Sequence, residues 1–274
     1  MKTKSIIGVL AMISLSFAAC EKPDLKPDNI STLRPGNDKA VDQLVPKMLP
    51  RIIFDSQTQE QSVFAYDDAG RLSKIANGTV TKSFEYDGLS RLVKVVTTNP
   101  STPGLSRIID YNYGPTKLKL PISLTEKTMD IQDHDILMRT VYFKFNAAGL
   151  KISESEIVDP YGAKDRLTLF EYDSKNNCTA ILKMTNGKKT SSVRFDEFDA
   201  QPNELLSLNI LQLLPGETVK KNNAQLIITQ NTDGIVSCER HAFEYLPNGW
   251  PVKEFLVAGS DRRLLKTISY LIVS

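Results

Sequence analysis

FAYDDAGRL at Phe64–Leu72 decides the fold of this 274-residue chain, and FEYDGLSRL at Phe84–Leu92 repeats it. In each copy one residue separates two aromatic rings, which places both rings on the same face of a β-strand. The Asp-containing segment that follows is typical of a tight turn, because Asp bonds the backbone ahead of it and Gly supplies a positive φ. A strand rich in Leu, Ile and Val then returns. Each copy therefore predicts a β-hairpin.

Aromatic pairs at positions i and i+2 recur along the chain and use 12 of its 21 aromatic residues. The first five pairs begin 20, 27, 32 and 27 residues apart, which is the length of one hairpin with its connections. We predict an all-β, antiparallel hairpin-repeat meander that forms a strongly curved sheet or an incomplete barrel. The rings are expected to fill its concave core rather than to form a ligand surface. The pairs are Phe64/Tyr66, Phe84/Tyr86, Tyr111/Tyr113, Phe143/Phe145, Phe170/Tyr172 and Phe243/Tyr245.

Two stretches depart from a regular hairpin pattern. Leu72 and Ile75 are three residues apart and cannot share a face of a regular strand, so either a bulge follows the turn or one of them is exposed. Asn203–Leu214, NELLSLNILQLL, has seven large aliphatic residues among 12 and is too long for a typical strand. We predict a short helix, with Asn203 as its N-cap, or an irregular apolar plug. It would cover the open end or one face of the curved sheet.

The first twenty residues have the organisation of a lipoprotein signal. Lys2 and Lys4 precede an apolar run that is too short to cross a bilayer, and Phe17-Ala18-Ala19-Cys20 forms a lipobox. Cys20 is therefore the expected lipidation site, where several acyl chains give stable anchoring. We predict a signal peptide at 1–20, a proline-rich flexible tether at 21–50 and a single antiparallel β domain at 51–274.

The net charge of the mature chain restricts the classes of partner that it can bind. The 34 basic and 32 acidic residues become 32 of each when Lys2 and Lys4 leave with the signal. A neutral chain without a basic run argues against nucleic acid as a partner.

The two remaining cysteines, Cys178 and Cys238, follow predicted turns. An envelope location permits a disulfide, although two separate buried thiols are favoured.

The hairpins resemble the tyrosine-aspartate (YD) repeats of RHS-type proteins, which build spiralling β-sheet shells. A wider resemblance is to secreted lipoproteins of Bacteroidota, which have YD-like hairpins, a leucine-rich stretch, an "NN" element and a G-Y-P-x-K hairpin. Glu204 and Trp250 depart from that pattern, where proline and tyrosine are usual. The resemblance implies a porin-like, strongly curved antiparallel sheet and an envelope address, and it transfers no catalytic residue. The matching segments are Phe198–Asn203, Asn222-Asn223 and Gly249–Lys253.

Candidate chemistry is sparse. Asp130–Asp135 gathers three carboxylates around His134, but it lacks the glycine and terminal glutamate of a calcium loop and is favoured as a solvated loop. His241 would need a nucleophile or acid nearby to act in catalysis. Trp250 is equally compatible with an exposed sugar or protein contact and with a structural ring beside Pro251. No common hydrolase, metalloprotease or nucleotide-binding motif occurs, so no catalytic, metal or cofactor residue is predicted.

Three functions remain open. The first is a non-enzymatic cell-envelope lipoprotein, anchored to the outer membrane through Cys20 and facing the surface or the periplasm, that binds a glycan, peptide or protein partner. The second is a carrier that encloses a lipid or other apolar ligand in an aromatic-lined concavity. The third is a hydrolase with an unrecognised site. The strands are not expected to span the membrane, since they carry charged residues opposite the aromatic rings.

Overall fold

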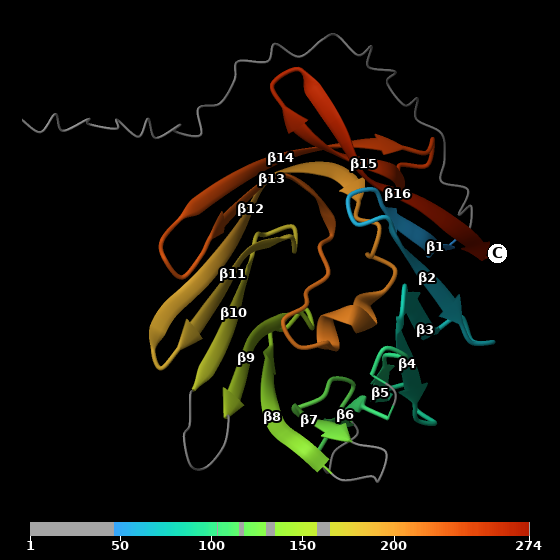
Figure 1. The fold of residues 1–274 in the computed structure, drawn as a ribbon, viewed down its shortest axis with the longest axis vertical. Coiled ribbons are helices and arrows are strands. Elements are labelled where there is room, and N and C mark those ends of the chain that lie inside the picture. The colour runs from blue at the N-terminus through green and yellow to red at the C-terminus, as the bar shows by residue number, and fades with distance from the viewer. Residues whose placement is uncertain (1–46, 103, 115–117, 130–134, 158–164, 274) are drawn as a thin grey trace, which may run out of the picture. The chain divides into compact units, whose positions relative to one another are not determined.

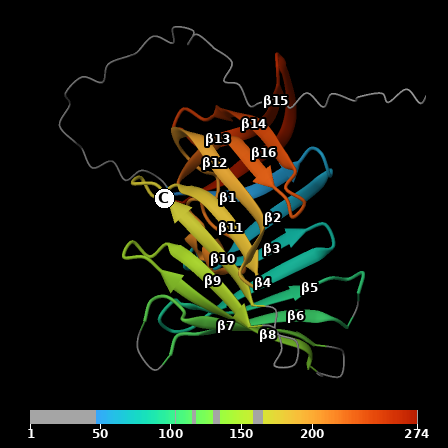
Figure 2. The same ribbon diagram turned by 90° about the vertical axis from the view of Figure 1, so that its left-hand side faces the viewer.

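Sixteen antiparallel strands, each hydrogen-bonded to its neighbour in sequence, form the barrel in Figures 1 and 2. The structure is a computed structural model that describes residues 47–273 except 103, 115–117, 130–134 and 158–164. The strands are β1 (Lys47–Asp55), β2 (Glu60–Tyr66), β3 (Leu72–Asn77), β4 (Val80–Tyr86), β5 (Leu92–Thr98), β6 (Ser106–Asn112), β7 (Ser123–Met129), β8 (Asp135–Phe145), β9 (Lys151–Ile157), β10 (Arg166–Tyr172), β11 (Cys178–Thr185), β12 (Lys188–Pro202), β13 (Asn222–Gln230), β14 (Val236–Tyr245), β15 (Pro251–Ala258) and β16 (Asp261–Val273).

The barrel is closed, which corrects the expected curved sheet or incomplete barrel. β1 pairs with β16 along its length, with Ile53 opposite Ile268. Closure satisfies the backbone groups that two free edges would leave unpaired. The hairpin pattern did not reveal closure, because closure depends on strand number and stagger around the whole ring. The all-β, antiparallel class is confirmed. β1 begins at Lys47, a few residues before the predicted domain start at 51.

The turn chemistry read from the sequence is present at the first hairpin. The Asp67 carboxylate accepts backbone N–H bonds from Ala69 and Arg71 at 3.1 and 2.8 Å. Gly70 has a φ of +69°, which a residue with a Cβ rarely adopts. Phe64 pairs with Ile75 but Tyr66 pairs with Leu72, so a bulge follows the turn. The bulge turns both aliphatic residues toward the core.

At five positions a tyrosine hydroxyl donates to a backbone carbonyl of the strand before it. Tyr86 of β4 donates to the carbonyl of Leu72 on β3 at 2.8 Å, and Tyr113 donates to Leu92 on β5 at 2.9 Å. In both cases the arginine that ends the Tyr-Asp turn, directly before the accepting leucine, lies over the ring, 4.5 and 4.3 Å from its centre. The same bond to a carbonyl of the preceding strand joins Tyr66 to Pro50, Tyr172 to Lys151 and Tyr270 to Pro251.

The connection between β12 and β13 runs inside the barrel, and we call residues 203–221 the plug (Figure 1). Its leucines pack against inward rings from β2, β4, β6 and β8 in one hydrophobic cluster. A second, smaller cluster joins Phe170, Cys178, Phe195 and Ala224. Five of the six aromatic pairs therefore belong to the core, as predicted, whereas Phe243 and Tyr245 are half-buried and belong to neither cluster. The buried first members are Phe64, Phe84, Tyr111, Phe143 and Phe170.

The plug differs from the predicted apolar helix. It contains one 3-10 helix, η1 (Asn209–Leu213), and the described residues contain no α-helix. Successive i to i+3 bonds hold the segment, among them Leu208 N–H to the Leu205 carbonyl and Leu211 N–H to the Leu208 carbonyl. Leu208, rather than Asn203, is at the N-cap of η1. Leucines contact the barrel on more than one side, so the segment lacks the single apolar stripe of a surface α-helix.

The two cysteines of the barrel are not joined to each other. Cys178 is a free, fully buried thiol on β11, where burial raises its pKa to about 11. Cys238 on β14 is exposed, in contrast to the expected buried thiol.

Candidate functional site

Several cavities lie between the plug and the barrel wall, among them two chambers near one end of the barrel and a cavity of about 320 Å³ beside Leu89–Leu92. The larger chamber, about 570 Å³, lies beside β1–β4, and the smaller chamber, about 370 Å³, lies beside β8–β12. Both volumes fall within the usual range for small-molecule sites. Both chambers include residues close to the turns at the end of the barrel opposite the Tyr-Asp turns, because consecutive turns of an antiparallel barrel alternate between its ends.

The larger chamber has an apolar floor and a polar rim. Phe64 and Ile75 from the wall face Leu211 and Leu214 from the plug. Only one of the paired aromatic rings lines this chamber, because the plug covers most of the others. The remaining lining residues are Ile53, Glu60, Ser62, Asn77, Thr79, Val80, Lys82, Glu204, Leu205, Glu217, Thr218 and Lys266.

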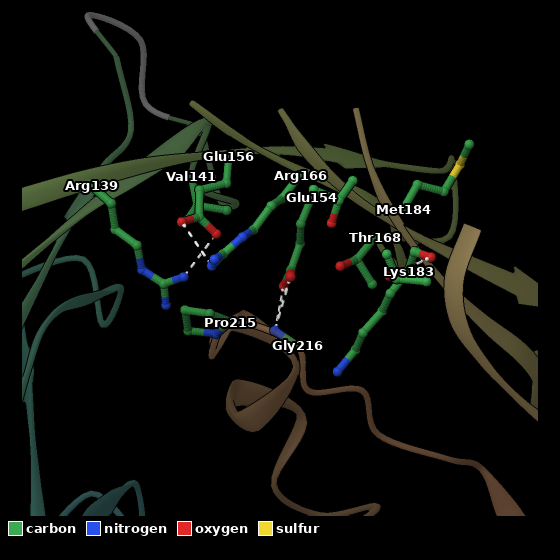
Figure 3. A pocket seen from close by; sticks show the side chains of 12 residues that line it. Arg139, Val141, Glu154, Glu156, Arg166, Thr168, Lys183, Met184, Pro215 and Gly216 are labelled. Atoms are coloured by element: carbon green, nitrogen blue, oxygen red, sulfur yellow. Dashed lines mark hydrogen bonds and ion pairs between the residues drawn. The ribbon is translucent and has the colours of Figure 1, made fainter. Parts of the chain in front are cut away.

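The smaller chamber is lined by charged side chains, as Figure 3 shows. Pro215 and Gly216 of the plug form one side, and the inner wall of the barrel forms the other. The wall residues are Arg139, Val141, Glu154, Glu156, Arg166, Thr168, Lys183, Met184, Thr185 and Thr190.

An alternating ladder of charges crosses five neighbouring strands beside this chamber, in the order Arg107, Glu126, Arg139, Glu156, Arg166. Arg107 binds Glu126 with two nitrogens, one of them at 2.8 Å. Arg139 bridges Glu126 at 2.6 Å and Glu156 at 2.8 Å. Arg166 reaches Glu156 only at 3.6 Å. The ladder thus has three cations and two anions, and the last of the cations, Arg166, is loosely held.

Burial and pairing set the ionisation of the middle of the ladder. Burial raises the pKa of Glu126, but hydrogen bonds from Arg107 and Arg139 outweigh it and lower that pKa below its usual value. Burial likewise opposes the charge on Arg139, yet its two glutamates raise the pKa of the guanidinium. Both groups therefore stay charged at neutral pH.

Lys151 and Glu154 fasten the plug to the wall. Lys151, fully buried on β9, donates to Glu154 and, at 3.0 Å, to the Leu214 carbonyl. Glu154 also accepts the Gly216 N–H at 2.9 Å. The Lys151 ammonium lies 4.9 Å from the centre of the Phe170 ring. Burial lowers the pKa of Lys151 even though Glu154 favours its charge. The Lys151–Glu154 pair therefore has a structural role, which is to join the plug to the barrel wall.

Besides the charge ladder and the Lys151–Glu154 pair, a third group of charged side chains joins β14, β15 and β16. His241 Nδ1 lies 2.7 Å from Glu254 Oε1, and the Lys266 ammonium lies 2.7 Å from Glu254 Oε2. Burial raises the pKa of Glu254, but the His241 hydrogen bond and the Lys266 charge outweigh it and lower the pKa to about 2. The sequence did not reveal this histidine–carboxylate contact. Neither His241 nor Glu254 lines either chamber.

The other predicted candidates have varied outcomes. Trp250 is half-buried and packs edge-on against Tyr270 at 5.5 Å, which agrees with a structural ring. Cys20 and His134 lie outside the described residues. Within the described ranges, no group of three or more His, Cys, Asp or Glu side chains is arranged to hold a metal ion. None of the helices described here is long and apolar enough to cross a membrane.

Comparison with known proteins confirms the predicted resemblance. Residues 64–102 match the RHS Repeat family model. A porin-like protein from Bacteroides vulgatus matches with a TM-score of 0.50 and 10% identity, over 81% of this chain and 98% of that chain. One from Bacteroides uniformis matches with a TM-score of 0.49 and 12% identity, over 82% and 95% of the two chains.

A lower-scoring match is to the Tc holotoxin pore of Photorhabdus luminescens, with a TM-score of 0.32 and 13% identity, over 80% of this chain and 13% of that chain. A search of curated proteins found no match. The chain therefore has RHS-type hairpins at residues 64–102 and a porin-like barrel fold.

Proposed function

We propose that this chain is a cell-envelope lipoprotein, attached to the outer membrane through Cys20, whose plugged barrel is a non-enzymatic binding module. The arrangement of the lumen is the main support. The plug occupies its centre, which argues against an open passage, and leaves cavities of ligand size, including the two chambers. The domain would face the cell surface or the periplasm on a tether of about 30 residues.

The outer wall of the barrel supports attachment by a lipid rather than by the strands. Cross-strand ion pairs lie on the face opposite the core, with Lys94 3.9 Å from Asp110 and Lys253 2.7 Å from Glu244. A lipid-facing barrel wall carries an apolar band instead. The buried charges described above bind one another or the plug, which favours a binding role over a catalytic one.

The ligand of the larger chamber is expected to combine an apolar part with polar groups, such as a glycan with an apolar face or a short peptide. Phe64, Leu211 and Leu214 would contact the apolar part, and rim residues such as Glu60 and Lys82 would orient the polar groups. The plug fills most of the aromatic concavity, so a carrier that encloses a lipid among the paired rings is less well supported.

A ligand screen with a chamber-blocking variant tests this proposal. Purified residues 21–274 are screened by thermal shift against glycans, peptides, fatty acids and divalent metals. We expect a glycan or peptide to stabilise the fold in proportion to its occupancy. Ser62→Trp, which fills the larger chamber, should abolish that shift. Val63→Trp, on the neighbouring outward position, should keep it. Loss in both variants, or stabilisation by fatty acids alone, would contradict the proposal.

Lipid attachment has its own test. Cys20→Ala should move the protein from the membrane fraction to the soluble fraction and abolish incorporation of labelled palmitate. Continued anchoring or labelling of this variant would show that Cys20 is not the attachment site.

A further inference from the structure

The smaller chamber contains two cations that the described acids bind only weakly or not at all. Of its charged lining residues, Glu154 is bound by Lys151 and Gly216, and Glu156 is bound by Arg139. Both acids therefore already have a cationic partner. Arg166 and Lys183 remain, and they face the chamber from the neighbouring strands β10 and β11.

The bonding of Arg166 leaves its donors available. Its guanidinium makes one ion pair, to Glu156 at 3.6 Å, which is too long for a good hydrogen bond. Its side chain is 53% exposed, whereas Glu156 is 10% exposed. Arg107, at the other end of the same ladder, instead uses two nitrogens on Glu126. Only one of the two terminal arginines is thus free to bind a further anion.

Lys183 lines the same chamber from the strand next to that of Arg166. No described acid lies within ion-pair distance of its ammonium. The strand register pairs Arg166 with Thr185 and Thr168 with Lys183, so Arg166 and Lys183 are diagonal neighbours on one face. Such neighbours lie about 7–8 Å apart, with their Cβ atoms somewhat closer, a separation that two long side chains can bridge through one shared anion. The Thr168 hydroxyl lies between them on the same face.

We propose that the smaller chamber binds a small organic anion, whose carboxylate or phosphate group is held between Arg166 and Lys183. A guanidinium matches the planar oxygens of either group with paired N–H donors, and a lysine supplies a second, adaptable charge. Val141 and Pro215 provide apolar contact for the rest of the ligand. The volume of about 370 Å³ admits a molecule of monosaccharide size, such as a sugar acid or a sugar phosphate. This site is independent of the larger chamber.

Calorimetric titration of purified residues 21–274 tests the site. The titration is done at low salt, because dissolved ions screen the contacts between charged groups and weaken them. Separate titrations use glucuronate, glucose 6-phosphate, inorganic phosphate and uncharged glucose. We expect saturable binding of one equivalent of at least one of the two sugar anions and no binding of glucose. Binding of glucuronate alone would identify a carboxylate ligand, and binding of the sugar phosphate alone would identify a phosphate ligand.

Variants determine whether that binding belongs to this chamber. Arg166→Gln and Lys183→Gln should each weaken it about tenfold or more, as expected when a charge-assisted hydrogen bond is removed. Arg107→Gln removes the equivalent terminal arginine outside the chamber and should leave the affinity within about twofold. Thermal melting of each variant checks that it folds.

Three results from the wild-type, Arg166→Gln and Arg107→Gln titrations would overturn the proposal. The first is that neither sugar anion binds saturably to the wild-type chain. The second is that inorganic phosphate binds saturably and the two sugar anions do not. The third is that Arg107→Gln and Arg166→Gln weaken binding equally. The Ser62→Trp variant should bind the anion normally. A loss there would place the binding in the larger chamber and also overturn the assignment.

Discussion

At the scale of single residues, the tyrosines that follow the buried rings have a second role besides packing, which their aromatic character alone does not reveal. Each donates its hydroxyl to a carbonyl of the preceding strand, so the ring packs in the core while the oxygen joins two hairpins. Burial raises the pKa of Tyr86 to about 12, which keeps the hydroxyl protonated as a donor. The Tyr-Asp pattern predicted the turn, but the target of the hydroxyl depends on the neighbouring hairpin.

We therefore expect Tyr86→Phe to lower the free energy of unfolding by about 1 kcal/mol, because the Leu72 carbonyl loses its partner. Tyr142→Phe, at an exposed position, is the control and should change it by less than about 0.5 kcal/mol. Urea denaturation of both variants measures the difference. Equal effects would mean that the Tyr86 hydroxyl bond is unimportant for stability.

The lowered pKa of Glu254 predicts a loss of stability in acid. Its pKa is about 2 in the folded chain against 4.5 for an ordinary glutamate. A lowered folded pKa stabilises the fold above the unfolded value, and the stabilisation is lost as the pH falls from about 5 to 2. The contribution is up to about 3 kcal/mol.

Denaturation at a series of pH values should show this slope in the wild-type chain and a shallower one in Glu254→Gln. Glu244→Gln, which removes an exposed acid paired with Lys253, should keep the wild-type slope. The same slope in all three proteins would exclude Glu254 as its source.

At the scale of elements, the plug is an apolar segment that packs inside the barrel without forming an α-helix. The sequence revealed that Asn203–Leu214 differs from the strands, and it allowed for an irregular plug. It did not place the segment inside a closed ring, because that position depends on contacts with β2, β4, β6 and β8 together.

The charge ladder had a recognisable signal that sequence reasoning missed. Arg107, Arg139 and Arg166 each lie four residues before the first aromatic ring of a pair, in phase with the buried face. A charged residue at that phase predicts an inward side chain. Its partners Glu126 and Glu156 lie on other strands, so the pairing requires the register of the barrel.

Packing of the plug leads to a stability prediction. Leu213→Ala should lower the free energy of unfolding by about 2–5 kcal/mol, because Leu213 is buried between the plug and the wall and would leave a cavity. Leu89→Ala, at an exposed turn position, should change it by no more than about 0.5 kcal/mol. Chemical denaturation distinguishes the two, and a small effect at Leu213 would mean that the plug is loosely packed.

At the scale of the whole molecule, the seam between β1 and β16 joins the two ends of the barrel sequence. All other strand pairs are neighbours in the chain, so the seam carries the largest cost of loop closure. We expect it to form after the folding transition state. Ile268→Ala should then accelerate unfolding by about 30-fold or more and hardly change the folding rate.

Val95→Ala provides the comparison, because Val95 pairs with Phe84 inside a local hairpin. It should slow folding more than Ile268→Ala does. Stopped-flow kinetics over a range of denaturant concentrations separates the two rates, and slower folding in Ile268→Ala would place the seam in the transition state.

The bond from a tyrosine to a carbonyl of the strand before it, repeated at five positions, has a consequence for how such barrels change in evolution. A unit that carries its own attachment to its predecessor can be copied in tandem, and the new copy binds the old one without further substitutions. Each duplication adds two strands, which preserves the even number that an antiparallel ring needs in order to close. The circumference of the barrel, and with it the room around the plug, can thus be set by the copy number of one short genetic repeat.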